Sequence, residues 1–165
     1  MQKNLKRFAA IKKHAVNKIN LKDMNKIKVL FLCVHNSARS QMAEAFLKKI
    51  GGENFEVESA GLEPGKLNPL AVKVMSEDGI DISKNPTKDV FSFFKEGRLF
   101  NYVVTVCDAK NSERCPIFPG VSKKIAWDFD DPSSFTGTED EKLKQTRIVR
   151  DKIKEAVENL VRGII

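Results

Sequence analysis

The 165-residue chain is poor in the residues that usually build metal sites or disulfide frameworks. It contains three cysteines, two histidines, one tryptophan and one tyrosine. No C-x-x-C pair occurs, and His14 and His35 lie far from any ligand-like spacing, so the sequence does not support a structural zinc site. So few cysteines favour catalysis or redox chemistry over a static framework.

Long hydrophobic runs are also missing. No apolar stretch approaches the roughly 20 residues that cross a bilayer. The basic N-terminus lacks the apolar segment and the small-residue cleavage site of a secretory signal. We therefore expect a cytoplasmic protein without a membrane span. The length suits one compact domain, which we expect to be a monomer.

The net charge of +7 is concentrated at the N-terminus, because residues 1–24 hold seven basic residues and one acidic residue. We predict a basic extension over residues 1–24, helical or disordered, followed by a nearly neutral domain over residues 25–165. The extension could contact nucleic acid, an acidic membrane or a partner, or could simply be solvated; for the core domain we expect no nucleic acid. Met24 could be the natural start, since the domain opens there on its first strand.

Strand-like and helix-like patterns alternate along the domain. Strands are expected over residues 26–33, 55–59, 102–107 and 123–127, and helices over residues 37–50, 69–78, 87–94 and 139–161. Such alternation predicts an α/β three-layer sandwich around a central four-stranded parallel sheet. The last helix carries apolar residues near helical spacing: Leu143, Ile148, Ile153, Val157, Leu160 and Val161. In such sheets a site lies at the carboxyl ends of the strands.

Cys33 stands at one such end, where the first apolar run meets the next helix. Backbone amides of the intervening loop and the helix N-terminus would favour an anion there, and Arg39 can grip two of its oxygens. The same positive field favours the thiolate form of Cys33, a nucleophile. The alternative is a buried structural cysteine beside a solvated arginine. The predicted anion-binding residues are Val34, His35, Asn36, Ser37, Ala38 and Arg39.

Two further features carry chemistry. Cys107 ends the third expected strand and Cys115 follows eight positions later, so the two thiols could pass a disulfide outward by exchange; the alternative is a core thiol and an incidental one. Asp131 precedes a proline, which favours an extended conformation, and it could protonate a leaving oxygen. Asp130 is the second choice for this acid, and the alternative is that both acids form a turn or a helix cap.

Four stretches together resemble the thioredoxin-coupled arsenate reductases, which have the low-molecular-weight protein tyrosine phosphatase fold: CVHNSARSQMAEAF, ESAGLEPGKLNPLAV, VVTVC followed by CP, and WDFDDP. The resemblance runs from about Lys26 to the C-terminus. The anion loop alone fits the phosphatases equally well. They hydrolyse phosphate monoesters through a phosphocysteine, here at Cys33. The cysteine pair favours the reductases, as do Ser133 and Ser134, where phosphatases carry tyrosines. A redox-sensing or anion-binding module tethered by the basic extension remains a third hypothesis.

The resemblance implies an oxidoreductase of arsenic detoxification with a redox-active disulfide. Cys33 would attack arsenate, Asp131 would protonate the leaving oxygen, and Ser40 would hydrogen-bond the Cys33 sulfur. Cys107 would then displace arsenite by forming a disulfide with Cys33, and Cys115 would pass that disulfide to thioredoxin, although a glutaredoxin-like donor stays open. No tightly bound cofactor is implied.

Some members of this family bind potassium near the loop. The matching positions here are Asn36, Glu44, Ser59 and Asp89. Asn36 would also brace the loop, or would be a simple turn residue. The loop departs from the family at His35, where a glycine is common, and at Ala38, where a cysteine is common. His35 could influence the anion and Cys33 through its own protonation, or could point to solvent.

Overall fold

A four-stranded parallel sheet forms the centre of the computed structural model, which describes residues 25–107, 114, 116–120 and 123–165. The strands run in the order β2-β1-β3-β4, and every pair is parallel. Their bounds are β1 (Ile27–Cys33), β2 (Phe55–Gly61), β3 (Tyr102–Thr105) and β4 (Lys123–Ala126). The helices are α2 (Arg39–Gly51), η2 (Gly52–Asn54), α3 (Pro69–Glu77), α4 (Val90–Lys95), η3 (Pro132–Ser134) and α6 (Glu139–Ile164). The predicted α/β sandwich is confirmed.

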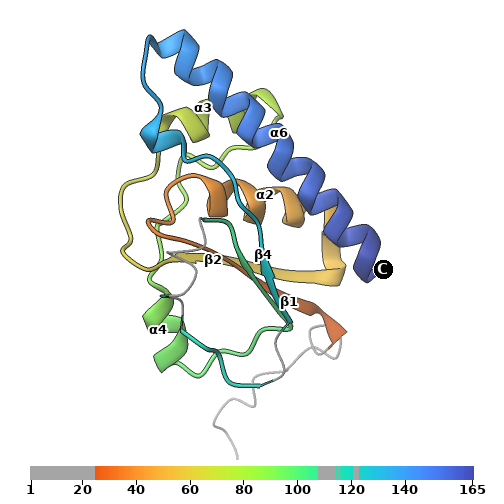
Figure 1. Cartoon of the computed structure of the whole chain (residues 1–165). Helices are drawn as coiled ribbons and strands as arrows, with labels where there is room; N and C mark the ends of the chain where they lie inside the picture. Colours follow the sequence, from red (N-terminus) through yellow and green to blue (C-terminus); the bar gives the residue numbers. More distant parts are fainter. Residues whose placement is uncertain (1–24, 108–113, 115, 121–122) are drawn as a thin grey trace, which may run out of the picture.

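Helices cover both faces of the sheet, as Figure 1 shows, with α2, α3 and α6 on one side and α4 on the other. β1 serves both faces because successive strand residues point to opposite sides. Val29, Phe31 and Cys33 join the core under α2, α3 and α6. Leu30 and Leu32 join the smaller core under α4. β1 is therefore buried on both faces from Val29 to Cys33, which explains the apolar sequence of that stretch.

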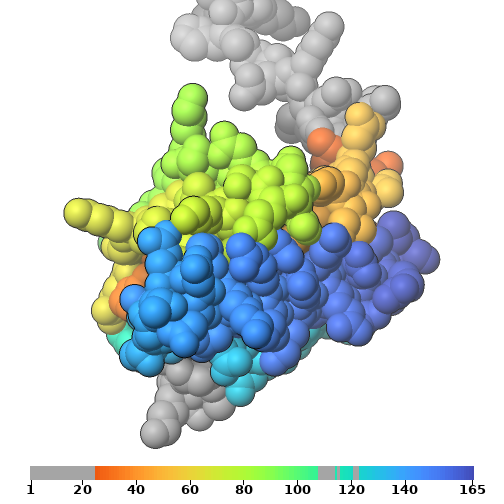
Figure 2. Space-filling view, turned by 90° about the horizontal axis from the view of Figure 1, so that it is seen from above, coloured from red at the N-terminus to blue at the C-terminus, as the bar shows by residue number. Residues whose placement is uncertain are grey.

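The longest helix, α6, packs across α2 and α3, and Figure 2 shows it lying beside α3 along one side of the molecule. It begins with a capping box, in which Thr138 and Glu141 bond each other's backbone amides. Its buried positions include Leu143, Val149 and Ile153, whereas Ile148, one of the apolar residues near helical spacing, is 50% exposed. Val149, about 100° further around the helix, takes the core position instead.

Several element boundaries differ from the predicted ones. The helix expected from residue 37 begins at Arg39, because Ser37 and Ala38 belong to the preceding loop. The strand expected to reach residue 107 ends at Thr105, although the Val106 amide still bonds the Leu32 carbonyl. The helix expected over residues 87–94 is α4, which starts three residues later behind the capping side chain of Asp89. The other strand and helix ends lie within three residues of the predicted ones, and several coincide with them.

Two predictions fall outside the described residues: the basic extension over residues 1–24, and the position of Cys115. Within the described part of the chain, no helix combines the length and the apolar character that crossing a membrane requires.

The packing of α6 predicts a contrast between two isoleucines on the same helix. Ile153 is fully buried in the larger core, whereas Ile148 is half exposed. Ile153→Ala should lower the free energy of unfolding by about 2–5 kcal/mol, because it removes buried methyl groups and leaves a cavity. Ile148→Ala should change it by less than about 0.5 kcal/mol. Urea unfolding followed by circular dichroism measures both, and equal losses would contradict the assigned packing.

Candidate active site

The loop between β1 and α2 is held by hydrogen bonds to its carbonyl groups. The carbonyls of Cys33, Val34, His35 and Ser37 accept from backbone amides of the segment that follows β2, at 2.8–3.2 Å; the donors are Leu62, Glu63, Gly65 and Asn68. The two ends of a peptide group point in opposite directions. Carbonyls turned outward therefore turn the amides of the loop inward, where they form a nest for an anion.

The sulfur of Cys33 lies at the base of this nest. The Asn36 amide donates to Sγ at 3.0 Å, and the Ser40 hydroxyl lies 2.9 Å from Sγ. Cys33 is 3% exposed, so these polar partners replace water around the sulfur. Hydrogen bonds to a thiolate favour the charged form, and the N-terminus of α2 adds to the same field. The arrangement suits a nucleophile.

Asn36 holds the loop in shape through its backbone and its side chain. Its φ of 52° is in the left-handed region, which asparagine tolerates better than most residues. Its side-chain nitrogen donates to Ser40 Oγ at 2.9 Å and to Ser59 Oγ at 2.8 Å. Its side-chain oxygen accepts from the Lys88 amide at 2.8 Å. The side chain thus ties the loop to β2 and to the segment before α4, as a bracing residue does.

Arg39 reaches the opposite wall of the site. One terminal nitrogen donates to the Phe129 carbonyl at 3.0 Å, and the other donates to Asp131 at 2.6 Å. A guanidinium carries five N–H donors, so others remain for an anion. The wall is held by aromatic contacts, because Trp127 packs at a tilt on Phe31 of β1 and edge-on against Phe129. Asp131 also caps η3 by accepting from the Ser133 amide.

Of the two candidate acids, Asp131 is the one in contact with the loop's arginine, and Asp130 is exposed. Asp131 also takes the capping role that the alternative interpretation gave it. The two roles are compatible, because one carboxylate oxygen accepts from Arg39 and the other from Ser133.

Cys107 lies near Cys33 in the topology of the sheet. Leu32 of β1 pairs with Thr105 of β3, and the ladder continues to Val106. Cys33 and Cys107 therefore follow neighbouring strands at the same edge of the sheet, and both thiols are reduced and buried.

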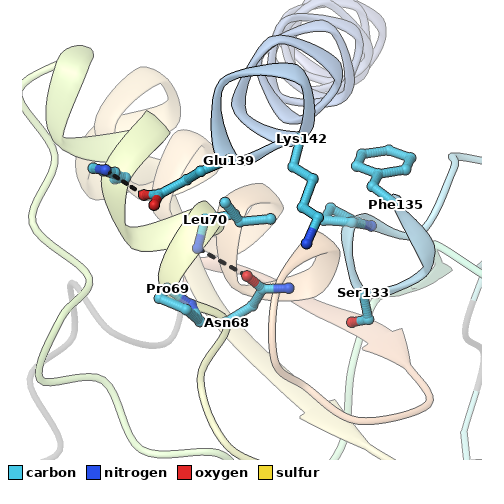
Figure 3. A pocket seen from close by; sticks show the side chains of 9 residues that line it. Asn68, Pro69, Leu70, Ser133, Phe135, Glu139 and Lys142 are labelled. Atoms are coloured by element: carbon cyan, nitrogen blue, oxygen red, sulfur yellow. Dashed lines mark hydrogen bonds and ion pairs between the residues drawn. The ribbon is translucent and has the colours of Figure 1, made fainter. Parts of the chain in front are cut away.

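A pocket of about 540 Å³ adjoins the loop (Figure 3). Asn68, whose amide bonds the Ser37 carbonyl, forms one wall, and Ser133 and Phe135, which follow Asp131, form another. Lys142 of α6 points into the space between these walls. The pocket extends the site towards solvent with polar and basic groups.

The outer rim of the loop carries His35, which is exposed, with Nδ1 3.0 Å from the Glu63 carbonyl. Arg114 reaches the same rim and bonds the Glu63 carboxylate. The hydrogen bond and charge of Arg114 hold the pKa of Glu63 below its usual value. His35 could influence the anion or point to solvent, and its exposure matches the second interpretation.

Two residues of the site were not singled out from the sequence. Gln41, in the first turn of α2, is buried and donates to the Asn36 carbonyl at 3.2 Å and to the Pro86 carbonyl at 3.0 Å. A polar Gln41 in the first turn of a helix that packs on the sheet could have indicated that it binds the loop. No such signal marks Lys88 in the sequence, because its contact Glu44 lies 44 residues earlier in the chain.

The four residues matched to potassium lie partly together. Asn36, Ser59 and Glu44 form a chain of hydrogen bonds, in which the Ser59 hydroxyl donates to the Glu44 carboxylate. Asp89 instead accepts from the Phe91 and Ser92 amides as the cap of α4. Two lysine ammonium groups, from Lys48 and Lys88, approach Glu44.

Comparisons with known proteins identify the fold and family. Residues 28–164 match the model of the low molecular weight phosphotyrosine protein phosphatase family, so the chain belongs to that family. It is 47% identical to an arsenate reductase of Oceanobacillus iheyensis over 131 residues, which cover 79% of this chain and 91% of the relative.

Solved structures point the same way. An arsenate reductase in its phosphate-binding state superposes with a TM-score of 0.68 at 33% identity, covering 84% of this chain and 99% of that one. The thioredoxin-dependent arsenate reductase of Corynebacterium glutamicum superposes with a TM-score of 0.64 at 28% identity, covering 84% of this chain and 61% of that one.

Gly61 provides a test of the loop geometry. A Cβ at Gly61 would lie 2.8 Å from the Asn36 nitrogen and from the Val34 oxygen, closer than side chains tolerate. Gly61→Ala should displace the loop, at a cost of about 1–3 kcal/mol in stability, and should abolish the binding of inorganic phosphate measured by calorimetry.

Gly65→Ala is the matched control, because its Cβ would meet His35 at an ordinary 3.5 Å. This variant should keep phosphate binding. Unchanged binding in Gly61→Ala would show that the loop does not depend on close contact with the end of β2.

Proposed function

We propose that this chain reduces arsenate to arsenite in the reducing environment of the cytoplasm, through a nucleophilic Cys33 and a disulfide relay that ends on thioredoxin. The observation that carries the proposal is the Cys33 sulfur at the base of an amide-lined loop, with a second buried thiol, Cys107, at the end of the neighbouring strand. The identity to arsenate reductases supports this choice within the family.

The first step uses the anion loop. Arsenate has the tetrahedral oxygens that inward-facing amides and a guanidinium recognise. The Cys33 thiolate attacks arsenic, an arsenic–oxygen bond breaks, and Asp131 protonates the departing oxygen, which leaves as water or hydroxide. An anion that takes over the Arg39 guanidinium releases Asp131 from its 2.6 Å contact.

The second step moves the electrons. The Cys107 thiolate attacks the Cys33 sulfur, a disulfide forms, and the electron pair of the sulfur–arsenic bond goes to arsenic, which leaves as As(III). Cys115 then attacks Cys107, which frees the Cys33 thiolate and leaves a Cys107–Cys115 disulfide. Two electrons from the thioredoxin dithiol reduce this disulfide by the same exchange chemistry. A thioredoxin-dependent enzyme among the structural neighbours supports this donor.

Phosphate-monoester hydrolysis is the second candidate, because the matching family is that of phosphotyrosine phosphatases. The same loop could hold a phosphoryl group, and Cys33 could form a phosphocysteine that water hydrolyses. This reaction needs Cys33, Arg39 and Asp131 but neither of the other thiols. Ser133 and Ser134 follow Asp131 in place of the tyrosines that phosphatases carry there, so Phe135 is the one aromatic ring that the described lining of the neighbouring pocket offers to a phosphotyrosine.

The two candidates differ in their need for Cys107 and Cys115. Arsenate-dependent NADPH oxidation, coupled through thioredoxin and thioredoxin reductase, should be sustained in the wild type and absent in Cys107→Ser and Cys115→Ser. Arsenite release without reductant separates the two variants. Cys115→Ser should release one stoichiometric burst, since the Cys33–Cys107 disulfide can still form, and Cys107→Ser should release none.

Hydrolysis of p-nitrophenyl phosphate by the same variants is the control for folding and for the loop. Cys33→Ser should lose both activities. If the wild type fails to turn over arsenate, while ester hydrolysis proceeds equally in both serine variants, the enzyme is a phosphatase with two bystander thiols.

Asp131→Asn tests the acid. Asparagine can still cap η3, so the wall of the site should remain in place. Loss of a general acid should lower kcat by about 10²–10⁴-fold, with a smaller change in the KM for arsenate. Asp130→Asn, one residue earlier and exposed, is the matched control and should stay close to the wild-type kcat. If both variants kept wild-type kcat, the proton would have to come from another source.

A further inference from the structure

The oxygens matched to a potassium site are already engaged by donors of the protein itself. The Asn36 side-chain oxygen accepts from the Lys88 amide, and Ser59 accepts from Asn36 while donating to Glu44. Asp89 accepts from two backbone amides and the Ser92 hydroxyl. A potassium ion needs several oxygen lone pairs directed at one point, as hard cations generally do. The described residues do not offer that arrangement.

The ammonium group of Lys88 lies where a cation would be needed. Its Nζ is 3.4 Å from each oxygen of the Glu44 carboxylate and 3.2 Å from Glu58. The Glu44 side chain is only 6% exposed, and an ionised carboxylate at that depth requires a compensating positive charge. The Lys88 side chain, 24% exposed, is held between the two carboxylates.

The same residue is connected to the anion loop in two ways. Its amide donates to the Asn36 side chain at 2.8 Å, and its carbonyl accepts from Gly61 at 2.8 Å. Its ammonium contacts the Glu44 carboxylate. Glu44 accepts a hydrogen bond from the Ser59 hydroxyl, and Ser59 accepts one from the Asn36 side chain. Asn36 in turn donates to Ser40 and, through its amide, to the Cys33 sulfur. A continuous hydrogen-bonded path therefore joins Lys88 to the nucleophile.

We propose that the Lys88 ammonium is the resident cation of this chain's anion loop, taking the place of a potassium ion, and that Lys88 is a positioning residue for Asn36. Lys48 also touches Glu44, but it is a surface residue of α2 and makes no described contact to the loop or to Glu58. The inference concerns the loop itself, and it rests on the proposed function only in its activity readout.

A solute cation could take over if Lys88 were removed. Glu44 lines a second pocket, of about 520 Å³, together with Lys48, Ile80 and Asn85. This pocket gives ions in solution a route to the carboxylate. Truncating Lys88 would leave a buried, negatively charged group open to that route, and a monovalent cation should bind there.

The decisive measurement is the melting temperature in potassium, sodium, ammonium and choline chloride at equal ionic strength. The wild type should melt at the same temperature in all four salts. Lys88→Ser should melt roughly 3–10 °C lower in choline chloride, because the buried Glu44 carboxylate keeps only Lys48 and loses the ammonium that also pairs with Glu58. Potassium or ammonium should restore part of this loss with a saturable dose dependence, since a ligand of the folded state raises its stability.

Lys48→Ser is the matched control, because it removes the other ammonium from the same carboxylate and leaves Lys88 in place. It should show no specific potassium response. Lys88→Gln serves as a second variant of similar length if the serine variant does not fold. A saturable, potassium-specific rise in the melting temperature of the wild type would overturn the proposal, as would Lys88 variants that ignore potassium and ammonium.

Arsenate kinetics give a readout that a merely structural lysine would not move. In choline chloride, Lys88→Ser should have a raised KM for arsenate, and added potassium or ammonium should lower it again while leaving wild-type KM unchanged. If the chain does not reduce arsenate, phosphate binding by calorimetry under the same salts replaces this assay. Loss of activity in every salt, with the melting response intact, would count against the proposed function and not against the Lys88 cation.

Discussion

The site depends on hydrogen bonds that turn the carbonyls of one short loop away from its centre. The segment after β2 supplies the donors, from Leu62 to Asn68. With the carbonyls engaged, the amides face the interior of the loop, where the Asn36 amide donates to the Cys33 sulfur. The parallel sheet makes this possible, because it brings the ends of β1 and β2 to the same edge, where Gly61 lets the two chains approach closely.

The second layer of the site consists of charges that neutralise one another. Arg39 pairs with Asp131 across the mouth, and Glu44, buried below the loop, is matched by Lys48 and Lys88. Glu58 continues the series by meeting both Lys88 and Arg98. These three carboxylates and four basic side chains therefore form pairs around the loop, and the backbone amides and the α2 N-terminus add to the field at the sulfur.

The sequence predicted the fold because the relevant signals are local. The apolar run of β1 and the alternation of strand-like and helix-like patterns act within a few positions along the chain. The loop from Cys33 to Arg39 is local too, so its residues could be predicted together. Ile148 shows the limit of periodicity, since this apolar residue is half exposed while the next one, Val149, is buried.

What the sequence did not predict depends on contacts between distant segments. The role of Gln41 depends on the Pro86 carbonyl, and that of Lys88 depends on Glu44 and Glu58. Neither pairing has a signature at a fixed spacing in the sequence. The segment before α4 comes to the site through an isolated β-bridge between Asp89 and Gly61, the last residue of β2. The potassium prediction placed four positions near the loop but could not show that a lysine from that segment approaches the same carboxylate.

A nest of amides and one guanidinium has a consequence for the influence of acidity on the protein. Peptide groups do not titrate, and an arginine keeps its charge throughout the physiological range. The capacity of the nest to hold an oxyanion therefore stays constant as the medium becomes more acidic or more basic. Any acidity dependence must originate outside these amides and this guanidinium.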